Sequence, residues 1–447
     1  MKNNKGITLV ALVVTIVVLL ILAGVSINLV LGNNGIIAKA KDAETKSAEA
    51  SENDLKGMNG LVSEMEGALA GNGGAGGSGT DTKVPAEATA ETAPYFPDNT
   101  FTKKEGTIDT GLVIQEASGN EYVWVVVPKS LYNNTVYNSN NAKKPSSSKD
   151  YANIEYCLQQ YTATYRDGTY YSDTYAADTN NVGWLTSEEY AELKNSMLKS
   201  VYENGGFYVG RYEAGIDTTT GTNRTSNTDK NSDGKYTIEG MPAPVSKADA
   251  YPYTYVTRTQ AQNLASNVNS GTKTSSLMFG VQWDLVLAFM SKDTAKITST
   301  DDLISNSTTI GNYINSTFDL NRGQYATADD LPKWYKINEN DSYGAVVNKK
   351  KMGDTSKQPV LITTGGTEQS KVMNIYDIAG NVFEWTLEKS PDARFPCAER
   401  GAFVATMVQP IRQPAAIATI RPVPTALVVF VSHFGRPESC MLEFEHS

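Results

Sequence analysis

The pattern of hydrophobic and polar positions divides the chain into an apolar start and a long polar remainder. From Ile7 to Gly32 the sequence is apolar apart from a few small polar residues, and it carries no charge. A helix of about 25 residues rises about 37 Å, which crosses a hydrocarbon layer of roughly 30 Å with some tilt. Lys2 and Lys5 precede the run without an acidic residue. Basic flanks stay in the cytoplasm, so we expect a single-pass membrane helix that leaves the rest of the chain outside the cell.

The next segments predict a stalk and a tether. Residues 33–70 are rich in Ala, Lys and Glu, and apolar side chains recur there at spacings of three and four, as on one face of a helix. These positions are Leu55, Met58, Val62, Met65 and Leu69. Residues 71–94 are rich in Gly, Ala and Thr and almost lack large apolar side chains. Such a composition cannot bury a core, so we expect a flexible linker there.

From Tyr95 onward the pattern predicts an α+β domain of short strands with much irregular structure. Glu121–Pro128 and Gly205–Gly215 have the β-branched and aromatic residues of strands. Helices are expected at Ser187–Glu203 and at 257–268, where Thr257 is a candidate N-cap. Met278–Lys292 is apolar on more than one face, which favours a buried helix.

Charge narrows the range of partners. The chain has a formal net charge of −10, a sequence pI near 5.0 and a mean hydropathy of −0.34. No basic surface dominates it, so the sequence favours no nucleic-acid partner.

The junction at Lys5-Gly6-Ile7 resembles the leader of type IV prepilins. The resemblance implies cleavage after Gly6 by a prepilin peptidase, methylation of Ile7, and a membrane helix that packs with other pilin-like subunits. The family usually has Glu at the fifth mature position, where this chain has Ala11. That departure favours a minor pilin or pseudopilin over a major subunit, and an uncleaved membrane anchor stays open.

Asn374–Thr386, with the sequence NIYDIAGNVFEWT, resembles the signature of the formylglycine-generating enzyme family. Its members, also called sulfatase-modifying factor domains, have a C-type-lectin-like fold. The resemblance covers most of 95–401, and it includes GFYVGRYEAG, the PVSK segment at Pro244–Lys247 and the apolar helix that carries Trp283. It implies one lectin-like domain over residues 95–401.

The same motif predicts a calcium site. Asn381 and Glu384 offer side-chain oxygens three residues apart, beside a turn at Gly380 whose carbonyl groups are available. The resemblance also implies a calcium ion at this turn. The alternative is that Asn381 and Glu384 hydrogen-bond the backbone without a metal. Phe383 and Trp385 are expected in the core.

A second oxygen-rich segment runs from Asp229 to Glu239. Asp229, Asn231 and Asp233 followed by Gly234 match the first half of an EF-hand calcium loop. The glutamate expected at loop position twelve is displaced by one residue, since Gly240 stands there. A solvated Asp-Gly turn is the alternative.

The inventory of catalytic side chains argues against an enzyme. The two histidines, His433 and His446, both stand in the last fifteen residues. The three cysteines, Cys157, Cys397 and Cys440, form no close pair in the sequence, whereas oxygen-dependent members of the family use two cysteines near the C-terminus. Cys157 is expected to be a small buried side chain.

The C-terminal tail has a different composition from the body of the domain. Residues 402–447 contain no Tyr, Asn, Asp, Lys or Trp and carry five of the 17 prolines. We interpret the tail as the product of a shifted reading frame, because the codons ATG GTN of Met407-Val408 contain GGT, a Gly codon, when they are read out of frame. The alternative is a hypervariable C-terminus diversified by a retroelement, as in receptors of this lectin-like family.

These features predict a bacterial surface protein, anchored in the membrane or associated with a pilus, that displays a non-catalytic binding domain for adhesion or ligand capture. Its expected partners are the membrane, prepilin peptidase, other pilin-like subunits and an extracellular ligand. The alternative is a structural minor pilin or pseudopilin of a type II secretion or type IV pilus system. A more distant alternative is an enzyme of the sulfatase-modifying factor type.

Overall fold

A computed structural model describes the chain from Phe96 onward, with gaps. The described residues are 96–97, 100–166, 173–178, 181–268, 273–304, 307–313, 316, 320, 322–327, 333–336, 360–390, 397–401, 425–427 and 430–433. The chain divides into two compact units, Met1–Gly79 and Thr80–Ser447, and every described residue belongs to the second. The predicted membrane helix at 7–32, the stalk and the linker lie outside the described residues. Among the residues that are described, no helix is both long and apolar enough to span a membrane.

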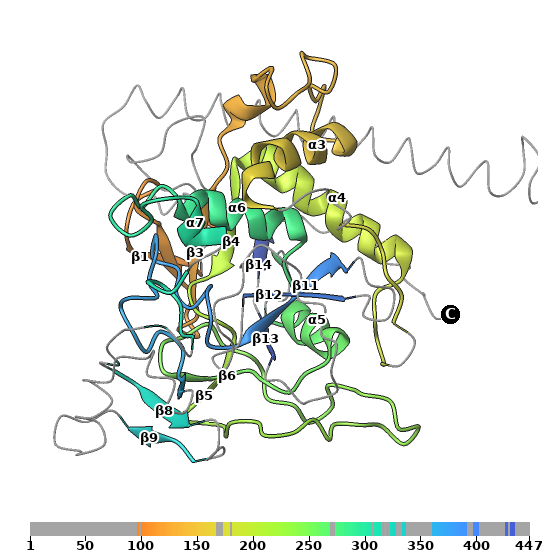
Figure 1. Cartoon of the computed structure of the whole chain (residues 1–447). Helices are drawn as coiled ribbons and strands as arrows, with labels where there is room; N and C mark the ends of the chain where they lie inside the picture. Colours follow the sequence, from red (N-terminus) through yellow and green to blue (C-terminus); the bar gives the residue numbers. More distant parts are fainter. Residues whose placement is uncertain are drawn as a thin grey trace, which may run out of the picture. The chain divides into compact units, whose positions relative to one another are not determined.

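A six-stranded sheet runs through the second unit, with the strand order β1-β2-β3-β4-β14-β7 (Figure 1). Its strands are β1 (Thr102–Glu105), β2 (Val113–Gln115), β3 (Glu121–Val126), β4 (Gly206–Gly210), β7 (Lys273–Ser276) and β14 (Phe430–His433). Each neighbouring pair is antiparallel. Every residue of β3 and β4 is buried, so these two strands form the centre of the sheet.

The described part of the chain also has three smaller sheets. The first consists of β10 (Val360–Ile362), β8 (Gln324–Thr327) and β9 (Tyr335–Lys336); the second of β12 (Cys397–Gly401), β11 (Phe383–Lys389) and β13 (Thr425–Leu427); the third of β5 (Gly215–Asp217) and β6 (Ala250–Pro252). β11 is the middle strand of its sheet, antiparallel to β12 and parallel to β13. It is the strand that carries the end of the Asn374–Thr386 motif.

In Figure 1 the helices α3, α4, α6 and α7 lie in the upper part and α5 lies lower, beside β11; α3 contacts α4 and α6, and α6 contacts β3. They are α3 (Tyr151–Tyr161), α4 (Ser187–Asn204), α5 (Arg258–Ser266), α6 (Gly280–Met290) and α7 (Asp301–Ile304), with short 3-10 turns η1 (Lys129–Asn133) and η2 (Ala163–Tyr165). Helices and antiparallel sheets together confirm a mixed α+β architecture.

The predicted helix at Ser187–Glu203 is confirmed as α4, and its sequence explains both ends. The side chain of Thr186 accepts a hydrogen bond from the Glu189 amide, and the Glu189 carboxylate accepts one from the Thr186 amide. This capping box pairs amides that a helix start otherwise leaves free. Gly205 ends the helix in the left-handed region at φ 73°, where a residue without Cβ is favoured.

The other strands and helices predicted within the described residues are also found, with shifted boundaries. α5 begins after Thr257, whose side chain accepts from the Gln260 amide in a second capping box. The strand expected at Gly205–Gly215 is interrupted, because β4 ends at Gly210 and β5 begins at Gly215.

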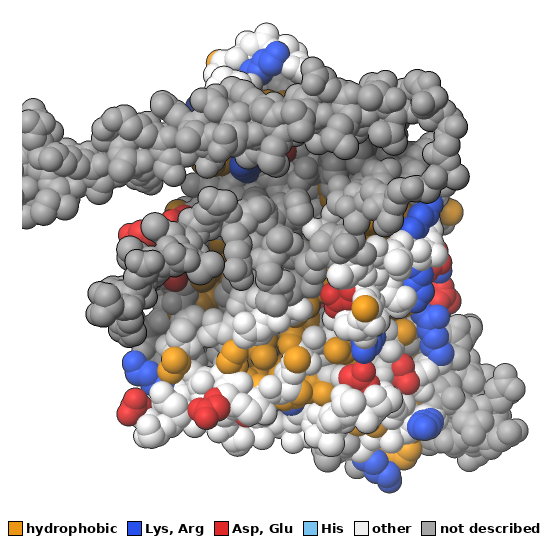
Figure 2. Space-filling view, turned by 180° about the vertical axis from the view of Figure 1, so that it is seen from behind, with side chains coloured by type: hydrophobic (Ala, Val, Ile, Leu, Met, Phe, Trp, Pro, Cys, Tyr) orange, Lys and Arg blue, Asp and Glu red, His pale blue; other side chains and the backbone are white. Residues whose placement is uncertain are grey.

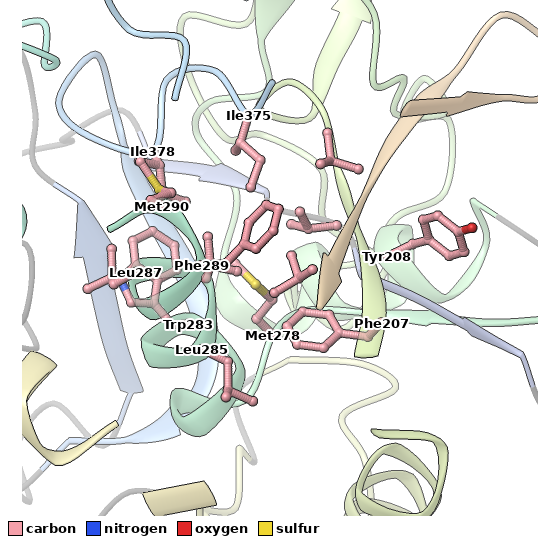
Figure 3. Packing of buried hydrophobic residues seen from close by; sticks show 14 of the residues in the cluster. Phe207, Tyr208, Met278, Trp283, Leu285, Leu287, Phe289, Met290, Ile375 and Ile378 are labelled. Atoms are coloured by element: carbon pink, nitrogen blue, oxygen red, sulfur yellow. The ribbon is translucent and has the colours of Figure 1, made fainter. Parts of the chain in front are cut away.

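α6 lies in the core of the unit, as its apolar sequence predicts. All eleven of its residues are buried, and Trp283 is fully enclosed. Figure 3 shows side chains of α6 packed with Phe207 of β4 and with Ile375 and Ile378 of the Asn374–Thr386 motif. The hydrophobic core therefore packs against the motif and holds it in place.

A buried ion network ties four distant segments together. Arg166 bonds Asp284 of α6 at 2.7 Å and also pairs with Glu388 of β11. Arg400 of β12 bonds the same Glu388 at 2.7 Å through its Nε. All four side chains are at most 5% exposed, so each charge depends on its partners, and the loss of one leaves another uncompensated. The network holds β11 and β12 against α6.

Two strands of the unit come from the tail beyond residue 401. β14 lies between β4 and β7, and β13 pairs with β11. A fragment that ended at Gly401 would leave β4 and β7 without the strand that joins them. The shifted reading frame stays a prediction, because it concerns the gene.

Candidate cation site

The turns that precede β11 bring an unusual number of left-handed residues together. Their φ values are 50° for Met373, 65° for Asn374, 58° for Asp377, 75° for Gly380 and 65° for Asn381. A Cβ on Gly380 would lie 2.5 Å from the Asn312 carbonyl oxygen, so only glycine fits there. This strained backbone is held by packing and hydrogen bonds, as is common at functional sites.

The side chain of Asn381 is fully hydrogen-bonded within the protein. Its oxygen accepts from Asn312 Nδ2 at 2.9 Å and from the Ile362 amide at 3.1 Å. Its nitrogen donates to Glu213 Oε2 at 3.0 Å and to the Ile362 carbonyl at 3.1 Å. Both lone pairs of the oxygen are used, so in this arrangement Asn381 joins β10 to the motif instead of offering an oxygen to a cation.

Glu384 is in the opposite situation. Its side chain lies on β11 and is fully buried, and neither carboxylate oxygen has a hydrogen-bond partner among the described residues. Gly401 of β12 pairs with Phe383 of β11. Because it has no side chain, Gly401 leaves room for the Glu384 carboxylate, since a Cβ there would lie 2.0 Å from Glu384 Oε2. A buried carboxylate without donors is costly unless it is protonated or meets a cation.

More acidic groups surround Glu384. Glu213, Asp377 and Glu399 are each at most 3% exposed, and all three act electrostatically on Glu384. Burial, followed by repulsion from Glu213, raises the pKa of Glu384 well above its usual value of 4.5. Burial, followed by repulsion from Asp377, likewise raises the pKa of Glu213 well above 4.5. The cluster therefore favours a bound positive charge.

The acidic groups differ in how far their oxygens are already used. Asp377 accepts from Ser370 Oγ and from the Gly365 amide, both at 2.6 Å. Glu213 uses Oε2 for Asn381, while its buried Oε1 has no partner in the described part of the chain. The oxygens that could bind a cation are therefore those of Glu384 and Oε1 of Glu213.

Glu213, Asp377 and Glu384 also border a cavity. It is lined by Val209, Gly210, Tyr212, Glu213, Ile375, Tyr376, Asp377, Ile378 and Glu384. Its space, counted together with the solvent at its mouth, is about 230 Å³. The rings of Tyr212 and Tyr376 stack at 4.9 Å, and the Tyr376 hydroxyl donates to Glu368. These contacts give the cavity a rigid aromatic wall.

The donor set suits a hard cation. Across the described residues, no group of three or more His, Cys, Asp and Glu side chains is placed to hold a metal. Calcium, however, completes its shell with backbone carbonyls and water as well as with carboxylates. The unpartnered buried oxygens of Glu384 and of Glu213 Oε1 are donors of the kind that such an ion takes.

The second predicted calcium segment forms a hydrogen-bonded turn. Arg224 bonds the Asp229 carboxylate at 2.6 Å, so the charge of Asp229 is already paired. The side-chain oxygen of Asn231 accepts from the amides of Asp233 and Lys235, each at 3.0 Å. Asp233 is exposed at the tip. These contacts are those of the solvated turn considered as the alternative, and the calcium loop stays a prediction.

The remaining candidate residues have different outcomes. Gly6 and Ile7 lie outside the described residues. Phe383 is buried as predicted, whereas Trp385 is partly exposed and donates its indole N–H to the Val256 carbonyl at 3.0 Å. Cys157 is confirmed as a buried free thiol in α3.

The sequence interpretation missed Glu213, Asp377 and Glu399. Glu213 stands two residues before the start of β5, in GRYEAG, and nothing local indicates that it turns toward the motif.

No protein-family model, curated protein or solved structure matches this chain.

Proposed function

We propose that the protein is a bacterial surface protein, anchored by Ile7–Gly32 or associated with a pilus, which displays a calcium-stabilised, non-catalytic binding domain. The domain is proposed to have the C-type-lectin-like fold that the Asn374–Thr386 motif implies. Its role would be adhesion or capture of an extracellular ligand.

The layout of the chain supports display at a surface. A long uncharged apolar run with a basic flank precedes a linker with almost no large apolar residue, and a polar unit follows. The boundary between the two compact units falls after Gly79, inside the segment expected to be the linker. A tether of this kind separates a binding domain from the membrane.

The observation that supports a calcium ion is the pair of unpartnered oxygens on Glu384, which is buried among other acidic side chains. A calcium ion would neutralise Glu384 and Glu213 and would fix the left-handed turns from Met373 to Asn381. In the proposed domain the ion is structural. It would keep the irregular loops rigid, so that a ligand face loses little conformational entropy on binding.

A structural minor pilin or pseudopilin is the second candidate. The Lys5-Gly6-Ile7 junction favours it, while Ala11 in place of the usual Glu favours a minor over a major subunit. In that case the folded unit would cap or decorate a filament without a ligand of its own.

The leader is tested by mass spectrometry of the mature protein together with membrane fractionation. A mature chain that begins at methylated Ile7 and sediments with membranes or filaments supports a prepilin origin. An intact Met1 in the membrane fraction leaves a plain anchor, and a chain absent from membranes and filaments refutes display.

Ligand capture is tested by surface binding of the full chain to arrays of glycans and surface proteins, with and without calcium. Binding that requires calcium is the expected result. Absence of any ligand, combined with loss of filaments or secretion after gene deletion, would favour the structural pilin. Fragments for this purpose should extend past His433, because β14 completes the six-stranded sheet.

A further inference from the structure

The connection between β3 and α3 is a basic loop on an acidic protein. No Asp or Glu occurs from Tyr122 to Lys149, although the chain as a whole has a net charge of −10. Lys143, Lys144 and Lys149 are exposed, and none of them has an ion pair within the described part of the chain. Lys and Arg side chains show at the top of Figure 2, where Figure 1 draws this loop.

The backbone of this loop is held in one shape. Ser139, Asn140 and Asn141 all lie in the left-handed region, at φ 52°, 59° and 72°, which costs free energy for residues with a Cβ. Asn138 is fully buried and compensates this cost, because its oxygen accepts from the Asn141 amide at 2.7 Å and its backbone carbonyl accepts from the Lys143 amide at 2.8 Å. A rigid loop presents its lysines at fixed positions.

The loop is also fastened to the helix beneath it. Ser139 Oγ lies 2.9 Å from the Tyr156 hydroxyl, and the Cys157 thiol donates to the Lys143 carbonyl. The Lys143 ammonium lies 5.8 Å from the centre of the Tyr156 ring. Ser139 and Lys143 therefore hold the loop against α3.

The start of α4 has the complementary charge. Glu188 and Glu192 are both exposed, and their spacing of four residues places them on the same face of the helix. Like charges at this spacing repel each other, and no ion pair compensates either carboxylate among the residues that the structure describes. This acidic face is open to a cationic partner.

The two charged surfaces lie apart on one molecule. In Figure 1 the basic loop is at the top, while α4 begins at the right-hand end of the helical layer. We infer that the basic loop of one copy docks on the Glu188–Glu192 face of a second copy. Different surfaces meet in such a contact, so it can repeat from copy to copy and forms either a closed ring or an open row.

Exposed ion pairs are weak individually, and salt screens them over about 10 Å at 0.1 M, so they would not hold free copies together. This inference therefore rests on the proposed function, in which the copies are held at a surface. Copies held in one membrane or filament meet at an effective concentration of about the millimolar range, which makes weak contacts count. We expect the docking among tethered copies at low salt.

Zero-length cross-linking tests the contact on the full chain. Isotopically light and heavy copies are reconstituted together in lipid vesicles and treated with a carbodiimide, which joins an amine to a carboxylate in direct contact. The expected result is mixed-isotope peptides that join the loop lysines to Glu188 or Glu192, reduced several-fold in 1 M salt. Flotation of the vesicles reports separately whether the chain is inserted.

A chain that floats without mixed-isotope cross-links at these positions overturns the docking and leaves the membrane anchor standing. A chain that does not float overturns both proposals. Lys144→Glu with Lys149→Glu should remove the mixed cross-links, as should Glu188→Lys with Glu192→Lys. Mixing the two double variants should restore them, because the unaltered loop of one variant can meet the unaltered face of the other, and the two altered surfaces also carry opposite charges. Lys230→Glu with Lys235→Glu, which alters two exposed lysines of another turn, is the matched control and should leave them unchanged.

Discussion

The substitution Glu384→Gln should stabilise the folded protein when calcium is absent and destabilise it, relative to wild type, when calcium is present. Without a cation, burial followed by repulsion from Glu213 raises the pKa of Glu384 well above 4.5, so the folded state favours the protonated carboxyl. Holding that proton at pH 7.5, three units above the usual pKa, costs about 4 kcal/mol at about 1.4 kcal/mol per unit. Gln has nearly the same shape and no proton to hold, so Glu384→Gln should be more stable in EDTA by up to about 4 kcal/mol.

With calcium the order changes. A ligand present at about a thousand times its Kd stabilises the folded state by about 4 kcal/mol. The wild-type chain should gain that amount in millimolar calcium, whereas Glu384→Gln, which offers no charge to the ion, should gain little.

The assay is unfolding of the full chain in detergent, followed by intrinsic fluorescence at pH 7.5 in EDTA and in calcium. Asp233→Asn, in the second predicted calcium segment, is the control and should behave as wild type, since Asp233 is exposed. The reasoning is refuted if calcium stabilises Glu384→Gln as much as wild type, or if the variant is the less stable protein in EDTA.

Three further outcomes follow from the described contacts. Burial, followed by repulsion from Glu388, raises the pKa of Asp173 from 3.8 to about 7, so the folded state holds a proton that the unfolded state releases. The free energy of unfolding should therefore fall by up to about 4 kcal/mol as pH rises from about 4 to about 7. Denaturant titrations should show less of this loss in Asp173→Asn. That variant keeps only one of the two hydrogen bonds that Asp173 accepts from the backbone amides of Gly280 and Val281. Thr186→Ala should cost about 1 kcal/mol in the same titration, because it removes the N-cap of α4, and Thr186→Ser should recover most of it. Truncation after Gly401 should abolish the cooperative unfolding transition seen by calorimetry, since β4 and β7 lose β14; a truncated chain that unfolds like the full one would show that β14 contributes nothing.

The calcium site at this turn stays a prediction, and the structure changes one of its details. The sequence identified the turn at Gly380 and the carboxylate of Glu384, because glycine and oxygen-rich side chains at short spacing are visible locally. It assigned Asn381 the same role, yet the structure gives that side chain four hydrogen bonds, with partners on β10 and at Asn312 and Glu213. Those partners are brought to Asn381 only by the folded chain.

The sequence by itself determined the local elements: the helix at Ser187–Glu203, the N-cap at Thr257, the buried run of α6, and the mixed α+β class. Caps and periodicity act within a few residues, so they can be read without knowing the topology. Only the tertiary structure brought Glu213 beside Glu384, placed Arg166 between Asp284 and Glu388, and inserted β14 between β4 and β7. Charges and strand partners far apart in the chain meet through its path in space, and no spacing rule along the sequence records that path.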